Sequence, residues 1–301
     1  MIKSTGKAVI ITGCDSGFGN GLAYELNCLG FYTIACCFNP DADGVKQLLN
    51  RCVFRDKLSI IQLDITDEIQ IDETYEKILR LLNNNELQLW SVVNNAGVFS
   101  IGFAEWGQGV DSYRKALDVN VLGTLRMTKK YLPLLRQSKG RVINVLSVAS
   151  RLAVEGYGPY CVSKYGLLGF TDSLRREMLR FGVHVVSIEP SCYRTPLSHI
   201  ETVESMIDSV WSQTPSHIRQ AYGDQVFEKF KSSYAFQVRR ARDPIEVINT
   251  MVEAISVAHP KPRYRCSGQL AAFIMSLAEL LPIQVFDSLW HLINKFEVIS
   301  K

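Results

Sequence analysis

Short apolar runs alternate with longer segments of helical period over residues 7–190. The runs are rich in Val, Ile or Leu, which is typical of strands buried on both faces of a parallel sheet. The pattern predicts strands at 8–12, 32–37, 58–63, 91–94, 141–146 and 183–188. It predicts helices at 18–29, 68–84, 111–136 and 159–181, the third bent at Pro133.

Six strands with intervening helices predict an α/β fold, a Rossmann-type doubly wound parallel sheet. After residue 190 the strand rhythm weakens, and helical patterns with scattered aromatic residues fill 195–265. We expect this part to cover a substrate. No repeat or low-complexity linker divides the chain, so we expect a single domain, 1–301. Its cofactor-binding and catalytic core is 7–195, and 196–301 forms the helical substrate cover with a C-terminal apolar segment.

Composition narrows the function classes. The net charge is +3 over 301 residues and the 33 Lys and Arg residues are scattered, so we expect no nucleic-acid partner. The eight cysteines have no CxxC spacing and the five histidines are isolated, so we expect reduced thiols in a reducing compartment and no metal site.

The two ends of the chain bear on localisation. Residues 1–7 lead directly into the first strand, without the regions of a secretory signal. The stretch 270–286 is apolar, but Glu279 and Pro282 interrupt it, and a membrane span needs ~20 residues. We therefore expect an intracellular protein that is not secreted. It is cytoplasmic, or peripherally associated with a membrane through this apolar segment.

A glycine-rich turn follows the first strand and leads into a helix, with the sequence Thr12-Gly13-Cys14-Asp15-Ser16-Gly17-Phe18-Gly19. A diphosphate needs close backbone approach, which glycines permit, and the free N–H groups at a helix start. We therefore expect a dinucleotide at this turn. A turn that binds no ligand is the alternative.

Further cofactor contacts are expected at the carboxyl ends of other strands. Asp64 follows the third run and is placed to bind the adenine amino group, the alternative being a helix N-cap. Residues 36–40 contain no Lys or Arg for the 2′-phosphate of NADP, which favours NAD. They also contain no acidic residue for the ribose 2′-hydroxyl of NAD, since Asn39 is neutral and Asp41 lies further along. The full set of expected cofactor-binding residues is Gly13, Asp15, Ser16, Gly17, Phe18, Gly19, Asp64, Ile65, Asn95, Ala96, Gly97, Tyr160, Lys164, Pro190 and Thr195.

Tyr160 and Lys164 are four residues apart in a helical pattern, so they share one face. A tyrosine has a pKa of about 10, and a neighbouring ammonium group favours its phenolate. We therefore expect Tyr160 to act as the catalytic acid/base with help from Lys164. Ser147 follows the fifth strand and is placed to hydrogen-bond the substrate oxygen.

These motifs, in this order and spacing, resemble the short-chain dehydrogenase/reductase family. The run Asn94-Asn95-Ala96-Gly97 resembles the family's NNAG motif. The segments 14–19, 141–144, 160–164 and 172–176 resemble its retinol and 17β-hydroxysteroid dehydrogenase branch. Segment 123–129 is similar to mitochondrial 3-hydroxybutyrate dehydrogenase. The resemblance implies a proton-relay water at Asn120, contact of Thr195 with the carboxamide of the cofactor, and a homodimer on helices 111–136 and 159–181.

The sequence departs from this branch in two places. Ser191 follows Pro190 where relatives commonly have glycine, which restricts that turn. The hydrophobic N-terminal anchor of membrane-bound retinol dehydrogenases is missing, so anchoring in the endoplasmic reticulum is not expected.

The resulting hypothesis is hydride transfer between NAD(H) and a secondary or allylic alcohol, or its carbonyl, in a lipid-like substrate such as a retinoid or hydroxysteroid. A 3-hydroxybutyrate-type dehydrogenase is the alternative, and it needs a cation for the substrate carboxylate. Candidates are Lys129, Lys130, Arg151 and Arg194. A catalytically silent NAD-binding sensor or scaffold is the alternative of another class, and the presence of Ser147, Tyr160 and Lys164 argues against it.

Overall fold

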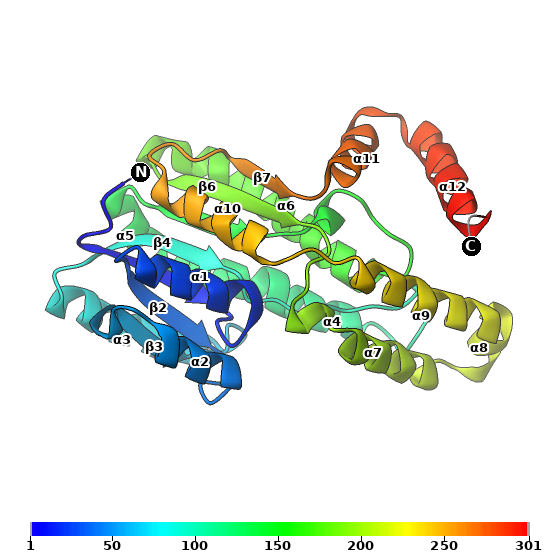
Figure 1. Cartoon of the computed structure of the whole chain (residues 1–301), viewed down its shortest axis with the longest axis horizontal. Coiled ribbons are helices and arrows are strands. Elements are labelled where there is room, and N and C mark those ends of the chain that lie inside the picture. Colours follow the sequence, from blue (N-terminus) through cyan, green and yellow to red (C-terminus); the bar gives the residue numbers. More distant parts are fainter. Residues whose placement is uncertain (1, 300–301) are drawn as a thin grey trace.

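Within the described residues, seven parallel strands form one sheet in the order β3-β2-β1-β4-β5-β6-β7 (Figure 1). The computed structural model describes residues 2–299; residues 1, 300 and 301, at the ends of the expected domain, lie outside the described residues. The strands are β1 (Lys7–Thr12), β2 (Tyr32–Cys37), β3 (Leu58–Gln62), β4 (Gln88–Asn94), β5 (Arg141–Val145), β6 (His184–Pro190) and β7 (Arg263–Cys266). The predicted doubly wound sheet and its six strands are confirmed, and β7 was not predicted.

Helices cover both faces of the sheet, which is why the strands are apolar on both sides. One core lies between the sheet and α1 (Gly17–Cys28), α2 (Asp43–Arg51) and α10 (Ile245–Ser256). The second core lies between the opposite face and α3 (Glu68–Asn84), α5 (Thr124–Ser138) and α6 (Gly158–Met178). β1 lies between β2 and β4, so the strand order reverses between β1 and β4. In such folds ligands bind at this switch point, beyond the carboxyl ends of the strands.

The helix expected at 111–136 is interrupted. The structure has α4 (Asp111–Leu117), a π-helical turn (Asp118–Gly123) and then α5. Gly123 lies so close to Ile65 that an added Cβ would approach the Ile65 side chain to 2.7 Å. The Asn120 carbonyl accepts a hydrogen bond from the Thr124 hydroxyl at 3.0 Å. Such local widening of a helix is frequent at functional sites. Pro133, where a bend was expected, lies within α5.

A third cluster forms the cover beyond the carboxyl edge of the sheet. It consists of α7 (Ile200–Gln213), α8 (Ser216–Tyr222) and α9 (Asp224–Arg239), packed on the loop that carries Ile101 and Trp106. Trp211 and Tyr234 are buried in it, and Trp106 and Trp211 have ring centroids 4.7 Å apart. The range 196–301 expected as cover also contains α10 and β7, which belong to the core.

The apolar stretch 270–286 forms parts of two helices, α11 (Gln269–Leu280) and α12 (Ile283–Ile299), separated at Leu281 and Pro282. Both extend away from the body of the molecule (Figure 1). Large apolar side chains are exposed along them, namely Leu270, Phe273, Leu280, Ile283, Val285, Leu289 and Leu292. No helix within residues 2–299 has both the length and the apolar character that a membrane span requires.

Candidate functional site

The glycine-rich turn packs directly on the loop after β4. An added Cβ at Gly13, whose φ is +69°, would lie 2.8 Å from the Ala96 Cα. At Gly19 it would lie 2.5 Å from both the Asn95 amide nitrogen and the Gly13 oxygen. The Thr12 hydroxyl accepts the N–H of Asn95 at 3.1 Å and of Ala96 at 3.0 Å. The turn therefore cannot take side chains at these positions.

The start of α1 has backbone groups free for a ligand. Ser16 occupies the N-cap position, but its side chain makes no capping hydrogen bond. The first N–H groups of a helix have no partner within the helix and attract anions. A glycine cradle next to an uncapped helix start therefore fits the diphosphate of a dinucleotide.

A cavity of about 850 Å³ extends from this turn to the catalytic residues. Fifteen of the seventeen distinct residues expected in the site line it: Gly13, Asp15, Ser16, Gly17, Phe18, Asp64, Ile65, Asn95, Ala96, Gly97, Ser147, Tyr160, Lys164, Pro190 and Thr195. Gly19 and Asn120 lie behind the wall.

Ser147, Tyr160 and Lys164 converge at the carboxyl ends of β5 and β6. Ser147 follows β5 and hydrogen-bonds Tyr160. Lys164, one turn along α6, places its Nζ 5.6 Å from the centroid of the Tyr160 ring and donates to the Val145 carbonyl at 2.9 Å. The three side chains can therefore act on one substrate oxygen.

Burial dominates the proton affinities of this group. It raises the pKa of Tyr160 to about 12, and the Ser147 hydrogen bond acts in the opposite direction. It lowers the pKa of Lys164 to about 8. The expected lowering of the phenol pKa by Lys164 is therefore not the net effect here, because removal of the phenolate from water dominates the shift.

Asn120 supports the site from behind. Its side chain accepts from the Val98 N–H at 2.8 Å and donates to the Val98 carbonyl at 3.0 Å and the Ser163 hydroxyl at 2.9 Å. Asn120 thus joins the loop after β4 to α6, which carries Tyr160. The water-holding role implied by the resemblance stays a prediction.

Asp64 is not the N-cap of α3, the alternative raised by the sequence. That position belongs to Asp67, which accepts the N–H groups of Ile69 and Gln70. Asp64 instead accepts the N–H and hydroxyl of Thr66, at 2.8 and 2.7 Å, in a turn at the cavity wall. Its contact with adenine stays a prediction.

Aromatic side chains that were not among the expected site residues surround Tyr160. Phe99 lies 5.0 Å from Tyr160, 5.6 Å from Tyr157 and 6.1 Å from Tyr234 between ring centroids. All line the cavity. The sequence pattern of a helix does not indicate which cavity a tyrosine faces. These aromatic residues are therefore identified only by the packing of α9 against the 99–106 loop.

The four cations proposed to bind a substrate carboxylate lie away from the cavity. Lys130 pairs with Asp72, Arg151 with Glu189, and Arg194 with Asp243. Lys129 is exposed on α5. Among the described residues, the cations in the cavity wall are Lys115 and Lys164. The eight cysteines are free, and no cluster of three metal-ligating side chains occurs in the described part of the chain.

Sequence comparison finds close likeness along most of the chain. The short chain dehydrogenase family profile matches residues 7–204. Retinol dehydrogenase 5 of Mus musculus is 37% identical over 302 residues, covering 97% of this chain and 91% of that protein. Mitochondrial D-beta-hydroxybutyrate dehydrogenase of Mus musculus is 37% identical over 266 residues, 87% of this chain and 77% of that one. The 17-beta-hydroxysteroid dehydrogenase type 6 of Bos taurus is 35% identical over 283 residues, 93% and 86%.

Solved structures share the fold. A short chain dehydrogenase/reductase of Burkholderia phymatum in complex with NAD has a TM-score of 0.73 at 20% identity, covering 92% of this chain and 94% of that one. A short chain dehydrogenase of Burkholderia cenocepacia J2315 in complex with NADP has a TM-score of 0.67 at 21% identity, covering 93% and 95%. The two neighbours hold different cofactors, so they do not discriminate between NAD and NADP.

Proposed function

This chain belongs to the short-chain dehydrogenase family, and from that premise we propose that it transfers hydride between NAD(H) and a lipid-like alcohol or carbonyl. The substrate carries a secondary or allylic alcohol, as in a retinoid or hydroxysteroid. The observation that supports this proposal most strongly is the single cavity that the glycine turn shares with Ser147, Tyr160 and Lys164.

The residues divide the chemistry among them. When bound against Gly13 and the start of α1, the nicotinamide cofactor supplies a hydride acceptor or donor. On oxidation the Tyr160 oxygen takes the hydroxyl proton of the alcohol, and on reduction it returns a proton to the carbonyl. Ser147 hydrogen-bonds the same oxygen, and Lys164 provides a second titrating group beside the phenol.

The lining around Tyr160 supports a lipid-like substrate. Phe99, Tyr157 and Tyr234 offer ring surfaces, and apolar pockets with few polar groups bind apolar ligands. The 37% identity to D-beta-hydroxybutyrate dehydrogenase keeps a short hydroxy acid as second candidate. Lys115, in the cavity wall, would then have to bind the carboxylate of that substrate, because the four cations expected from the sequence lie away from the cavity.

Absorbance at the reduced-nicotinamide band tests the proposal. Purified protein is offered NAD or NADP with retinoids, hydroxysteroids and 3-hydroxybutyrate. Turnover of the first two classes supports the proposal, while oxidation of 3-hydroxybutyrate alone replaces it with the second candidate. Cofactor binding without any turnover would favour a sensor or scaffold.

We expect the rate of alcohol oxidation to rise with pH through an apparent pKa near that of Lys164, about 8. In this proposal the neighbouring Tyr160 and Lys164 share one proton, and oxidation needs the form of the pair that has lost it, so a change at either group moves the apparent pKa. Carbonyl reduction needs that proton and should fall over the same interval. Profiles of kcat from pH 6.5 to 9.5 in both directions check this, and a flat oxidation profile would contradict it.

NAD is the proposed cofactor because a carboxylate lies at the end of β2. Asp15 accepts the N–H of Phe38 at 3.0 Å and of Asn39 at 2.6 Å, directly after that strand. In this fold an acidic group there binds ribose hydroxyls and an extra phosphate needs a cation. The acidic residue sought at 36–40 is thus supplied by the glycine turn.

We expect Asp15→Asn to improve NADP binding by about tenfold and to change NAD binding much less, because one repelling charge is removed while the amide oxygen still accepts a hydrogen bond. Fluorescence titration with both cofactors measures the two Kd values. Asp43→Asn is the matched control, since Asp43 is an exposed acid on the neighbouring helix. An unchanged ratio of Kd values in Asp15→Asn would show that selectivity arises elsewhere.

We further propose that α11 and α12 contact a membrane surface. Their exposed Leu, Ile, Val and Phe side chains would enter the interface between headgroups and acyl chains, close to the source of a lipid-like substrate. This would make the protein peripherally membrane-associated, and we place that membrane inside the cell as part of the same proposal. Co-flotation of the full chain with phosphatidylcholine vesicles tests it, and recovery of all protein in the unbound fraction would refute it.

A homodimer through the neighbouring helices α4, α5 and α6 is the last element of the proposal. Leu122, Val162 and Tyr165 are exposed there to 45%, 46% and 42%, which is apolar surface that a second copy would cover. Sedimentation equilibrium distinguishes one copy from two.

A further inference from the structure

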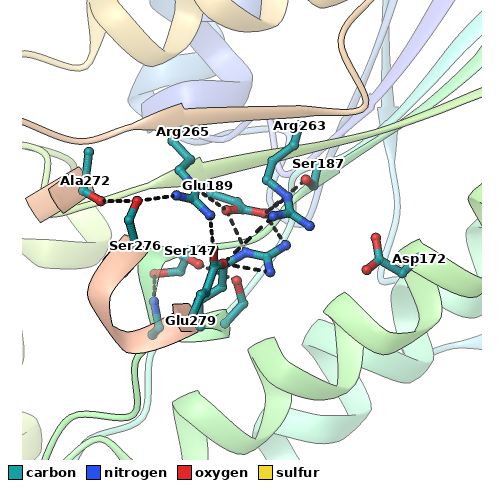
Figure 2. Close-up of polar contacts among 12 residues, drawn as sticks. Ser147, Asp172, Ser187, Glu189, Arg263, Arg265, Ala272, Ser276 and Glu279 are labelled. Atoms are coloured by element: carbon teal, nitrogen blue, oxygen red, sulfur yellow. Dashed lines mark hydrogen bonds and ion pairs between the residues drawn. The ribbon is translucent and has the colours of Figure 1, made fainter. Parts of the chain in front are cut away.

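Five charged side chains form a cluster between the catalytic edge of the sheet and α11 (Figure 2). This ionic cluster consists of Arg151, Glu189, Arg263, Arg265 and Glu279. They come from the turn after β5, the end of β6, β7 and α11. Its two ends thus lie on the catalytic core and on the apolar C-terminal segment.

The centre of the ionic cluster is a bidentate pair. Arg151 donates to Glu189 through Nε at 3.0 Å and Nη2 at 3.1 Å. Glu189 is fully buried, and Ser187 and Arg263 contact its Oε1 at 3.1 and 3.2 Å. Two parallel hydrogen bonds fix the plane of a guanidinium group. The pair therefore joins the ends of β5 and β6, which carry Ser147 and Pro190.

Glu279 attaches α11 to this pair. Its Oε1 lies 3.0 Å from Nη1 of Arg151, and its Oε2 accepts from Arg265. Burial acts to raise the pKa of Glu279, but the hydrogen bond from Arg265 and the nearby arginine charges outweigh it and hold the pKa below its usual value. Because Met275 is the buried apolar residue of α11, polar contacts provide much of the attachment of this helix.

Arg151 also ends the short turn that positions the catalytic serine. A single 3₁₀ turn, Val148–Ser150, begins at Ser147, whose Oγ accepts the Ala149 N–H at 3.1 Å. The Arg151 N–H donates to the Val148 carbonyl at 3.0 Å. One hydrogen-bonded turn therefore connects the backbone of Arg151 to Ser147.

We propose that Arg151 is a positioning residue for Ser147, and that Glu279 holds it in place, so that docking of α11 sets the geometry of the catalytic serine. The expected effect on the rate rests on the proposed function, whereas the expected effect on the 147–151 turn is independent of it. Arg151 uses Nε and Nη2 for Glu189 and Nη1 for Glu279, and Glu189 is the other carboxylate of the ionic cluster, so no second acid in the cluster is free to replace Glu279 at Nη1.

A displaced Ser147 has a specific chemical consequence. Its hydrogen bond lowers the pKa of Tyr160, so loss of that bond raises the pKa of the phenol. The other titratable groups that act on Tyr160, namely Cys161, Cys192, Tyr234 and the neighbouring Lys164, are left in place. The pH profile of oxidation therefore separates mispositioning of Ser147 from a general loss of stability.

The test is Glu279→Gln in the full chain, with Glu68→Gln as matched control because it breaks the Glu68–Arg126 pair on the far side of the sheet. We expect kcat to fall about tenfold with the Kd of NAD unchanged, and the apparent pKa of oxidation to rise. Arg151→Lys should act in the same direction, since lysine keeps the charge but cannot form the bidentate pair. Unchanged kcat and pH profile in both variants would overturn the inference.

Hydrogen exchange of the peptide spanning 146–152 provides a readout that needs no turnover. Faster exchange in Glu279→Gln than in wild type and Glu68→Gln is expected, and equal exchange would overturn the inference. If wild type turns over no substrate, the proposed function fails while the exchange result still decides whether Glu279 positions the turn.

Discussion

Tyr160→Phe is expected to lower kcat by about 10³-fold while leaving NAD binding nearly unchanged. The substitution removes the oxygen that exchanges a proton with the substrate and keeps the ring that packs 5.0 Å from Phe99. The reaction then has no acid or base at hydrogen-bonding distance from the substrate oxygen. Steady-state rates and cofactor fluorescence titration measure the two effects separately.

Tyr157→Phe is the matched control in the same cavity. Its hydroxyl donates to Gln237 at 3.2 Å near the exposed end, not to Ser147. We expect it to change kcat less than about tenfold, because a hydrogen bond outside the reacting group contributes modestly. Comparable losses in both variants would mean that Tyr160 is not the acid/base, and full activity of Tyr160→Phe would mean the same.

Arg141→Leu is expected to reduce the free energy of unfolding by about 2–5 kcal/mol. Arg141 is fully buried at the start of β5 and donates to the carbonyls of Ala254 and Val257 at 2.7 and 2.8 Å. These carbonyls at the end of α10 would lose their donor. The guanidinium also stacks 4.4 Å from the Trp90 ring, a contact that leucine does not reproduce.

Urea unfolding at constant pH measures this loss, with Arg136→Leu as the surface control. Arg136 is exposed on α5, so its replacement should change stability by less than about 0.5 kcal/mol. Equal midpoints for the two variants would mean that the buried guanidinium contributes no more than an exposed one.

The sequence predicts the sheet, and the position of the expected site residues at its carboxyl edge, because both depend on local signals. Parallel strands buried on two faces appear as continuous apolar runs, and the residues directly after them gather at one edge. Gly13 and Ser147 follow from this rule, whereas Tyr160 follows from its four-residue spacing to Lys164 in a helical pattern. The rule does not find β7, because Arg263 and Arg265 have the pattern of a polar surface segment, and their ion pairs with Glu189 and Glu279 form only in the folded state.

The features that were missed all depend on contacts between distant segments. Asp15 meets the N–H groups after β2 only once the turns that follow β1 and β2 lie side by side. The π-helical turn at Asn120 reflects its bonds to Val98 and Ser163, neither of which periodicity indicates. The raised pKa of Tyr160 likewise depends on how completely the cover encloses it.

The indole pair of the cover is a built-in optical reporter. Trp106 and Trp211, at 4.7 Å and an interplanar angle of 58°, are close enough for their transition dipoles to couple and give a signal in near-ultraviolet circular dichroism. Neither ring is in the cavity wall, so a bound cofactor does not touch them. Loss of this signal on heating, before the helical signal decreases, would reveal that the cover melts as a separate cooperative unit.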